Sequence, residues 1–219
     1  MKVEERIETT KETNDLFNEP FMDLSVENMV KEDKPEKVGK KQIKSKMKSS
    51  APTRHVFRRC YSEHKLFNVM PKTIKDGDCI HILSGGDIDA LSFLIWVLRK
   101  QKIKHLIFST WVMSKTDAEM IIDYQTKGDI EEIDGYVGEI FKSKNLRVFE
   151  YLKENLKGDL SVFRNHSKVF AGNGELFDFA ITSSANINTN PRVENTNIFI
   201  GTDVMKFYKD FYKDINSFK

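Results

Sequence analysis

The chain has 219 residues and nearly balanced charge, with 35 Lys and Arg against 33 Asp and Glu. This length holds one domain of about 150 residues with a tail, or two small domains. The longest apolar run, ALSFLIWVL, is far short of the roughly 20 residues that a membrane span needs, and the charged start MKVEERIETTKE does not resemble a secretory signal. Cys60 and Cys79 show neither metal-ligand spacing nor a disulfide framework, which fits a reducing compartment. We therefore expect a soluble cytoplasmic protein without membrane contact.

The N-terminal part carries its charges in blocks. Residues 1–30 contain three Lys or Arg against eight Asp or Glu, whereas residues 31–75 contain fourteen against four. Between Lys31 and Lys48 there are eight lysines and little apolar content, so this stretch cannot bury enough surface to offset its ordering entropy. We expect a flexible arm over residues 1–50, acidic and then lysine-rich, and a basic connecting segment over residues 51–75.

The basic charge of this region has two interpretations. A lysine run is most often simply solvated, but lysines also neutralise backbone phosphates, and arginines next to aromatics such as Phe57 and Tyr61 can stack on bases. The second interpretation predicts nucleic acid as a partner. Its candidate contacts are Lys40, Lys41, Lys44, Lys46, Lys48, Arg54, Arg58 and Arg59.

From Asp76 onward, apolar runs rich in β-branched residues alternate with helical patterns. Strands are expected over residues 79–85, 104–110, 134–141, 160–171, 177–184 and 197–201. Helices are expected over residues 87–100, 114–127, 146–156 and 203–218, the second of them capped by Ser114. This alternation predicts one α/β domain over residues 76–219, with a sheet that helices flank on both faces.

Two other polar features are interpreted as structural. The Ser84-Gly85-Gly86-Asp87 turn lacks the remaining residues of a phosphate-binding loop, so we interpret it as a turn with an Asp cap. His81 and His105 lie inside apolar strand patterns, which favours core or sheet-end positions over metal ligation.

The most informative residues lie near the C-terminal end. His166 and Lys168 stand two apart in FRNHSKVFAG, so on one strand they face the same side, and the segment SSAN with Ser184 and Asn186 follows. An imidazole acts as nucleophile or proton carrier near neutral pH, and a neighbouring ammonium can hold phosphoryl oxygens. This set indicates phosphodiester chemistry.

The pattern resembles the signature of the phospholipase D superfamily, a His-x-Lys, an Asp after four further residues, and a later Gly-Ser-x-Asn. His166, Lys168, Ser184 and Asn186 match it, whereas Ser183 replaces the Gly and Asn173 replaces the Asp. The resemblance covers residues 76–219 and does not reach the first 75. It implies a phospholipase D-like mixed sheet flanked by helices on both faces.

The resemblance also implies a mechanism. One His attacks phosphorus to form a phosphohistidine, and a second His protonates the leaving oxygen; neither a metal nor another cofactor takes part. Glu194, which follows the Ser-x-Asn segment, resembles the residue that orients the nucleophilic His in single-motif members. Because this chain carries a single motif, a homodimer with the site on its two-fold axis is expected.

The favoured function is a metal-independent phosphodiesterase, a nuclease, since the basic arm suits a polyanion and no membrane-seeking segment is evident. The alternative is a catalytically inactive nucleic-acid-binding or structural protein, which Asn173 and Ser183 favour and the intact His166, Lys168 and Glu194 oppose. A third class, an enzyme acting on phospholipids, would cleave lipid micelles and not DNA. DNA and RNA remain equally open as substrates.

Overall fold

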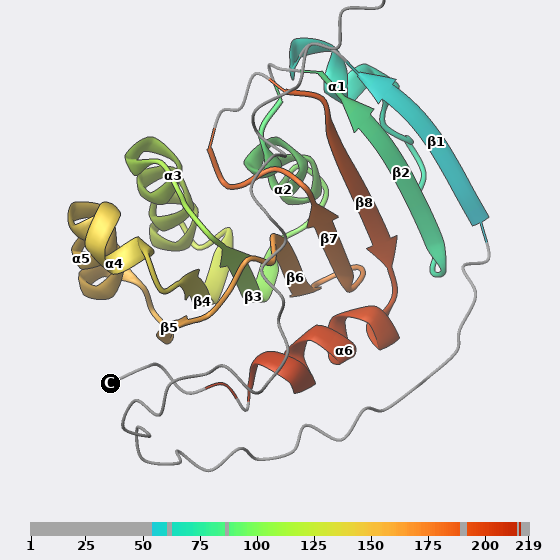
Figure 1. The fold of residues 1–219 in the computed structure, drawn as a ribbon. Helices are drawn as coiled ribbons and strands as arrows, with labels where there is room; N and C mark the ends of the chain where they lie inside the picture. The colour runs from blue at the N-terminus through green and yellow to red at the C-terminus, as the bar shows by residue number, and fades with distance from the viewer. Residues whose placement is uncertain (1–53, 61–62, 86–87, 189–191, 214, 216–219) are drawn as a thin grey trace, which may run out of the picture. The chain divides into compact units, whose positions relative to one another are not determined.

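The computed structural model describes residues 54–60, 63–85, 88–188, 192–213 and 215. The expected arm of residues 1–50, with its lysine candidates, lies outside the described residues. One eight-stranded sheet organises the fold, in the order β1-β2-β8-β7-β6-β3-β4-β5 (Figure 1). The strands are β1 Arg54–Cys60, β2 Asp78–Ser84, β3 Ile103–Thr110, β4 Ile130–Gly138, β5 Leu160–Phe163, β6 Val169–Gly174, β7 Phe179–Ser183 and β8 Glu194–Ile200. The helices are α1 Glu63–Val69, α2 Ala90–Leu98, α3 Lys115–Thr126, α4 Phe141–Lys144, α5 Leu146–Asn155 and α6 Thr202–Tyr212.

The sheet is mixed. Strands β3, β4 and β5 run parallel, and β1 runs parallel to β2. The central pairs, β2 with β8, β8 with β7, β7 with β6 and β6 with β3, are antiparallel. Ends of strands from distant parts of the sequence therefore meet at the same edge of the sheet.

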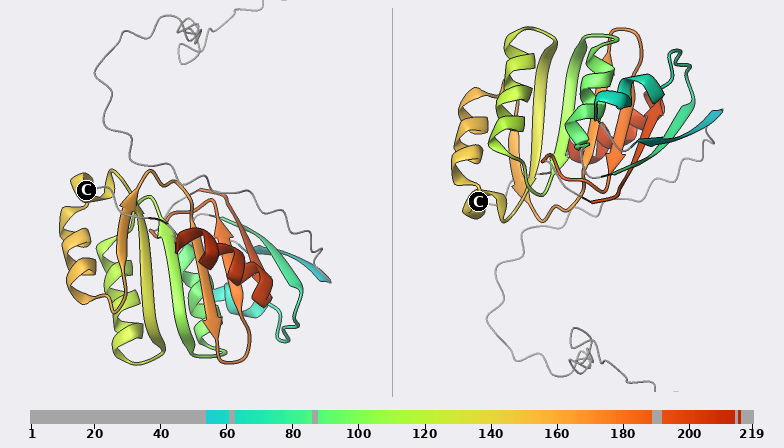
Figure 2. Two further views of the ribbon diagram at one scale, coloured as in Figure 1. Left: turned by 90° about the horizontal axis from the view of Figure 1, so that it is seen from below. Right: turned by 90° about the horizontal axis from the view of Figure 1, so that it is seen from above.

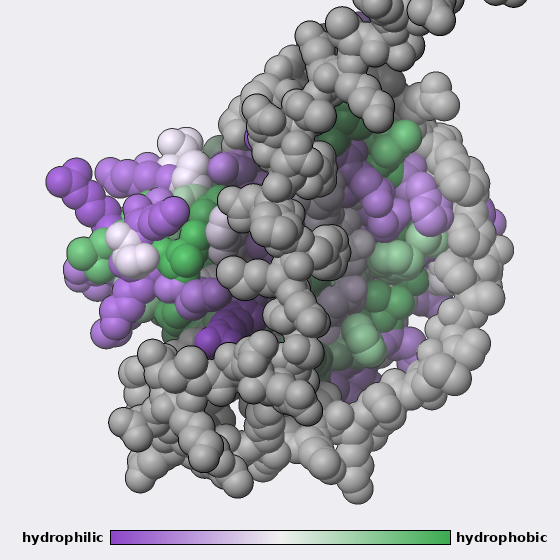
Figure 3. Space-filling model, viewed as in Figure 1, coloured by the Kyte–Doolittle hydropathy of each residue, from purple (hydrophilic) through white to green (hydrophobic). Residues whose placement is uncertain are grey.

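Helices cover both faces of the sheet (Figure 2). The larger apolar core joins α1, α2, α3 and α5 to one face, where Phe93 and Phe108 are fully buried. On the other face, Tyr212 of α6 packs with Ile107 and Ala180 of the sheet. The outer surface of the layer that α3, α4 and α5 form is dominated by hydrophilic residues (Figure 3). The expected α/β fold, a mixed sheet between helices, is thus confirmed.

Side chains cap the N-termini of helices α2 and α3. Ser114 accepts a hydrogen bond from Asp117 N, 3.1 Å away, which confirms it as the cap of α3. The expected cap of the preceding helix, the Asp of the Ser84-Gly85-Gly86-Asp87 turn, was wrong by two residues. Helix α2 begins at Ala90 and its cap is Asp89, whose Oδ1 accepts from Ser92 N at 3.0 Å. Helix α2 is buried on nearly every side, as its uniformly apolar sequence predicts. Among the described residues, no helix is long and apolar enough to cross a membrane.

The sheet extends beyond the expected start of the domain at Asp76. Strand β1 lies in the basic segment of residues 51–75 and pairs along its whole length with β2. Helix α1 follows in the same segment, and its Leu66 is fully buried in the larger core. This segment therefore contributes an edge strand and a helix to the folded unit.

The prediction of one continuous strand over residues 160–171 was wrong. Strand β5 is parallel to β4, whereas β6 is antiparallel to β3, which itself runs parallel to β4. The chain must therefore reverse its direction between β5 and β6. Residues 164–168 make this reversal, so His166 and Lys168 lie in a loop at the edge of the sheet.

Candidate active site

The residues of the predicted site converge at one edge of the sheet. Strands β2, β3 and β7 end at this edge, and β6 and β8 begin there. The loop before β6 is joined directly to the end of β7, because Ser183 N donates to Lys168 O at 3.0 Å. The sequence segments HSK and SSAN are therefore neighbours in space.

His166 and Lys168 differ sharply in exposure. The His166 side chain is exposed, whereas Lys168 is only 9% exposed. Lys168 Nζ donates to His166 O at 2.7 Å and lies 3.1 Å from Nδ1 and 3.4 Å from Nε2 of the same ring. Since the ammonium is nearly equidistant from both ring nitrogens, a phosphoryl oxygen that reaches the ring edge also reaches this donor.

Burial lowers the pKa of Lys168. Desolvation disfavours the ammonium and lowers the pKa of Lys168 below its ordinary value, while the negative charge of Glu194 opposes that shift. Glu194 is itself 8% exposed, at the first position of β8. The site thus pairs a buried cation with a buried carboxylate beside an exposed imidazole.

Ser184 and Glu194 form a second part of the site. Ser184 Oγ donates to Glu194 Oε2 and accepts from Asn195 N at 2.9 Å. Ser184 N in turn donates to Asn195 O at 2.9 Å. That Glu194 orients the His166 ring stays a prediction. In the structure, the Glu194 carboxylate holds the Ser184 hydroxyl by a hydrogen bond.

The two departures from the expected pattern have different positions. Ser183 replaces a glycine, and its Oγ accepts from Ala185 N at 3.1 Å and lies 2.9 Å from Thr196 Oγ1, so the fold accommodates the hydroxyl. Asn173 lies far along β6, opposite His105 and roughly 16 Å from Lys168 at the rise of an extended strand. Neither change removes a polar group from the surroundings of His166.

Asn186 follows β7 in the chain, in a segment that lies beside the start of α3. The following residue, Ile187, bridges to Met113 and accepts from Ser114 N at 3.0 Å. Asn186 Oδ1 is buried and has no hydrogen-bond partner among the described residues, and the same holds for Asn188 Oδ1. Both amides thus have an acceptor left for a ligand, because buried acceptors are normally paired.

A buried network that the sequence did not reveal holds the loop of His166. Asn165 Nδ2 donates to Ser109 Oγ at 2.8 Å and to Tyr136 O at 2.9 Å. Asn165 Oδ1 accepts from Ser167 N at 2.9 Å, and Ser167 Oγ lies 2.8 Å from Tyr212 OH. These contacts fasten the residues on either side of His166 to β3, β4 and α6.

The sequence also did not identify Trp111 as a residue of the site. It directly follows β3, and its ring lies 5.1 Å from the His166 ring, centroid to centroid, at an angle of 54°. We call the edge of the sheet at which β2, β3 and β7 end the active edge. The position of Trp111 directly after a strand that ends there is the signal in the sequence that could have identified it.

The arginine candidates belong to β1. Arg54 forms an ion pair with the buried carboxylate of Asp78, with Nε 2.6 Å from Oδ1, so its charge serves the fold. Arg58 and Arg59 pair through their backbones with Ile82 and Leu83. Their side chains lie outside the described part of the structure.

The described residues contain one cluster with suitable ligand atoms for a metal ion, away from His166. His105 Nε2 lies 2.9 Å from Asp134 Oδ2, and Glu132 completes the group within 4.8 Å. Burial opposes ionisation of Asp134, but the hydrogen bonds from His105 and from Asp159 N outweigh it and lower its pKa. The His105–Asp134 hydrogen bond by itself accounts for this contact.

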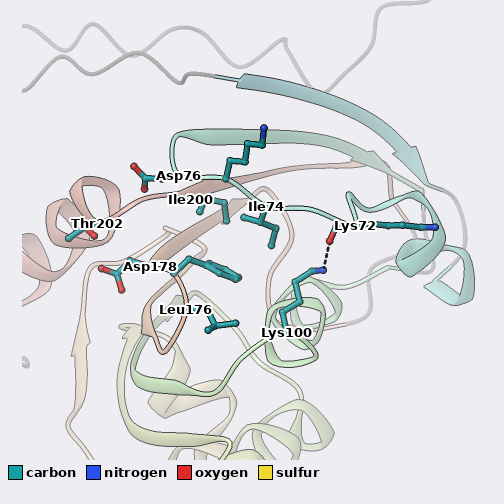
Figure 4. Close-up of a pocket in the computed structure, with 10 residues that line it drawn as sticks. Lys72, Ile74, Asp76, Lys100, Leu176, Asp178, Ile200 and Thr202 are labelled. Carbon is teal, nitrogen blue, oxygen red and sulfur yellow. Dashed lines mark hydrogen bonds between the residues drawn. The ribbon is translucent and has the colours of Figure 1, made fainter.

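A pocket of about 550 Å³ opens at the opposite edge of the sheet, where β2 and β7 begin and β8 ends (Figure 4). Lys100 and Lys72 line it together with Asp76 and Asp178, and Lys100 Nζ donates to Lys72 O at 3.5 Å. This pocket contains none of the predicted site residues.

Comparisons with known proteins show distant structural similarity. No protein-family profile matches the chain, and no curated protein sequence matches it. Polyphosphate kinase from Porphyromonas gingivalis is 13% identical with a TM-score of 0.47; the match covers 62% of this chain and 25% of the kinase chain. Phosphatidylserine synthase from Haemophilus influenzae Rd KW20 is 12% identical with a TM-score of 0.46, covering 62% of this chain and 37% of that one. TrmBL2, an archaeal chromatin protein, is 9% identical with a TM-score of 0.45, covering 66% and 54%. The chain thus spans between a quarter and about half of the length of these proteins.

Proposed function

We propose that the protein is a metal-independent phosphodiesterase of the phospholipase D type that cleaves nucleic acid. The observation that carries this proposal is the exposed His166 ring with the buried ammonium of Lys168 3.1 Å from its Nδ1. This contact supports the proposal because, in it, His166 serves as the nucleophile and the adjacent Lys168 as the cation for the phosphoryl oxygens. Ser184 and Glu194 lie at the same edge of the sheet.

The proposed reaction proceeds in two steps. A ring nitrogen of His166 attacks phosphorus, the bond to the leaving oxygen breaks, and a second imidazole donates a proton to that oxygen. That second imidazole then takes a proton from water, and the resulting hydroxide displaces His166 from phosphorus. Lys168 stabilises the charge on the phosphoryl oxygens in both steps.

The second imidazole is proposed to come from another copy of the chain. Among the described histidine side chains, His81 Nδ1 bonds Asn197 Oδ1 at 2.8 Å and His105 bonds Asp134, both in the sheet. A two-fold contact at the edge that carries His166 would bring two copies of this residue to one phosphate. We therefore propose a homodimer as the active species.

Nucleic acid is favoured over lipid because of the charge distribution. Residues 31–75 carry fourteen Lys or Arg against four Asp or Glu. Lysines in such a segment bind backbone phosphates without regard to sequence, in a salt-dependent manner. Lys40, Lys41, Lys44, Lys46 and Lys48 are proposed to bind the polyanion, together with Arg58 and Arg59.

The proposal is tested by cleavage of labelled DNA and RNA in EDTA, with lipid micelles as a third substrate. His166→Ala is expected to abolish cleavage because it removes the nucleophile, and Lys168→Ala to slow it on the order of 100-fold, as for loss of one transition-state donor. His81→Asn, which changes a histidine outside the site, is the matched control and retains activity.

The results separate the candidate functions. Wild-type turnover by His166→Ala, or loss of all activity in EDTA, contradicts the proposed mechanism. Binding of nucleic acid without cleavage by the wild-type protein identifies the alternative, a catalytically inactive binding protein. Activity confined to micelles identifies a phospholipid-processing enzyme.

A further inference from the structure

Trp111 lies at the active edge in a position that differs from those of the core aromatics. It is half-buried, and it belongs to neither of the two apolar clusters that the described residues form. Trp96, by contrast, is 3% exposed inside the larger core. The indole of Trp111 instead contacts the ring of the candidate nucleophile, His166.

The orientation of Trp111 is fixed by a glycine. A Cβ on Gly138, the last residue of β4, would lie 2.5 Å from Trp111 Cδ1 and 2.9 Å from Asn165 O. The missing side chain therefore leaves the space in which the indole packs against the β4 backbone. With Gly138 on one side and His166 on another, the ring is held in place before any ligand binds. A preorganised ring loses little conformational entropy when a ligand stacks on it.

Two exposed arginines stand close in the chain to residues of the candidate site. Arg164 stands two residues before His166, and Arg192 stands two residues before Glu194; both are exposed. Proteins that bind single-stranded nucleic acid combine cations for the backbone with aromatic rings on which bases stack. The active edge contains both components.

We infer that Trp111 stacks on an unpaired nucleobase adjacent to the phosphodiester that His166 and Lys168 hold. This inference rests on the proposed function and specifies its substrate. A base inside a duplex is already stacked on both faces, so an indole at the scissile phosphate selects single strands, frayed ends or flaps. A lipid headgroup has no aromatic face to offer, so the same residue discriminates against it.

The test combines substitution of Trp111 with removal of the base. The substrates are two single-stranded oligonucleotides with one cleavable linkage, flanked by a normal nucleotide in one and by an abasic residue in the other. For the wild-type protein, kcat/KM is expected to fall on the order of tenfold with the abasic substrate, the loss of one base-aromatic stack. Trp111→Leu is expected to lose the same factor on the normal substrate and to treat both substrates alike, while Trp111→Phe retains most of the preference.

The outcomes distinguish stacking from support of His166. If Trp111→Leu slows cleavage of both substrates by one common factor, Trp111 acts through the His166 ring and the inference is overturned. Phe207→Leu, which changes a 61% exposed aromatic on α6, is the matched control and leaves the preference intact.

A binding measurement separates this inference from the proposed reaction. If the wild-type protein cleaves neither oligonucleotide, the proposed activity fails. Stacking is then tested by titrating the same oligonucleotides into Trp96→Phe, in which Trp111 is the remaining tryptophan. Stronger quenching of its fluorescence by the normal than by the abasic oligonucleotide supports the inference, and equal quenching overturns it.

Discussion

At the scale of single residues, buried charges in this fold are compensated by a partner brought from elsewhere in the sequence. Lys168 is compensated electrostatically by Glu194, and Asp78 is compensated by Arg54, 24 residues before it. The Arg54 guanidinium is partly exposed at 38%, whereas the Asp78 side chain is fully buried. An arginine that the sequence alone assigns to nucleic acid therefore serves to compensate a charge inside the fold.

Loss of the Arg54 partner is expected to destabilise the protein. Burial opposes ionisation of Asp78, but the hydrogen bonds from Arg54 and Lys75 N outweigh it and hold the Asp78 pKa below its ordinary value. Because this folded-state pKa is depressed, the stabilisation is present above the unfolded-state value of about 3.9 and is lost as the pH falls through the folded-state value. Arg54→Ala should thus lower the free energy of unfolding at pH 7 and should lower it by less at pH 3.

Urea unfolding at the two pH values measures this effect. Lys127→Ala is the matched control, because Lys127 forms an ion pair with Asp123 in which both side chains are at least half exposed. Exposed pairs of this kind contribute less than about 1 kcal/mol. Equal destabilisation by the two substitutions would contradict the role assigned to Arg54.

At the scale of elements, the reversal between β5 and β6 positions the chemistry. Residues 164–168 carry His166 and Lys168, and the side chains of Asn165 and Ser167 bind this loop to the sheet and to α6. Asn165 is 5% exposed, so its amide satisfies polar groups that water does not reach. The loop is therefore held at two points, one on each side of the catalytic candidate.

Removing the Asn165 amide should affect stability and rate together. Asn165→Ala removes the acceptor of Ser167 N and the side-chain donor to Tyr136 O, whereas the Ser109 hydroxyl keeps its contact with Ser167 Oγ. Buried unsatisfied groups cost about 1–3 kcal/mol. A displaced His166 should slow cleavage on the order of tenfold to a hundredfold. Thermal unfolding and kcat below the transition temperature measure the two effects.

Tyr212→Phe is a milder change for comparison, because it removes one hydroxyl from the same hydrogen-bond network and keeps the packed ring. It should lower stability by about 1 kcal/mol and change kcat less than Asn165→Ala does. An Asn165→Ala protein with unchanged kcat and KM would show that the network supports the fold without positioning His166.

At the scale of the whole molecule, one chain provides one motif at one edge of an open sheet. The proposed mechanism needs two imidazoles at phosphorus, and the other histidine side chains that the structure describes, His81 and His105, form hydrogen bonds within the sheet. The active species should therefore be a pair of chains whose contact lies near His166 and Asn186.

Dilution and mixing test this assembly. Specific activity should fall as the protein is diluted below its dissociation constant, and mixing His166→Ala with wild-type chains should yield hybrids with impaired turnover. The control is mixing with Phe207→Leu chains, which leaves turnover unchanged. Sedimentation that shows only monomer at concentrations of full activity would exclude the dimeric site.

The sequence by itself determined the kind and order of most elements from β2 to α6, the exceptions being α4 and the break between β5 and β6. It also determined the cap of α3 at Ser114 and singled out the HSK and SSAN residues of the candidate site. These features depend on short-range physics: apolar periodicity, a side chain that caps a nearby N–H, and the spacing of polar groups along one segment. The convergence of HSK and SSAN could also be anticipated, because a hairpin joins β6 to β7.

Only the tertiary structure decided which distant groups meet. The apolar run over residues 160–171 could not show that β5 joins β4 and β6 joins β3, because strand pairing is a long-range choice. In the same way, Asn165 bonds Ser109 across 56 residues, and Trp111 meets His166 because β3, which ends just before Trp111, pairs with β6, which begins just after Lys168. Local pattern selects the kind of element at each position, whereas burial of the two faces of the sheet selects its neighbours, and it was the neighbours that defined the site.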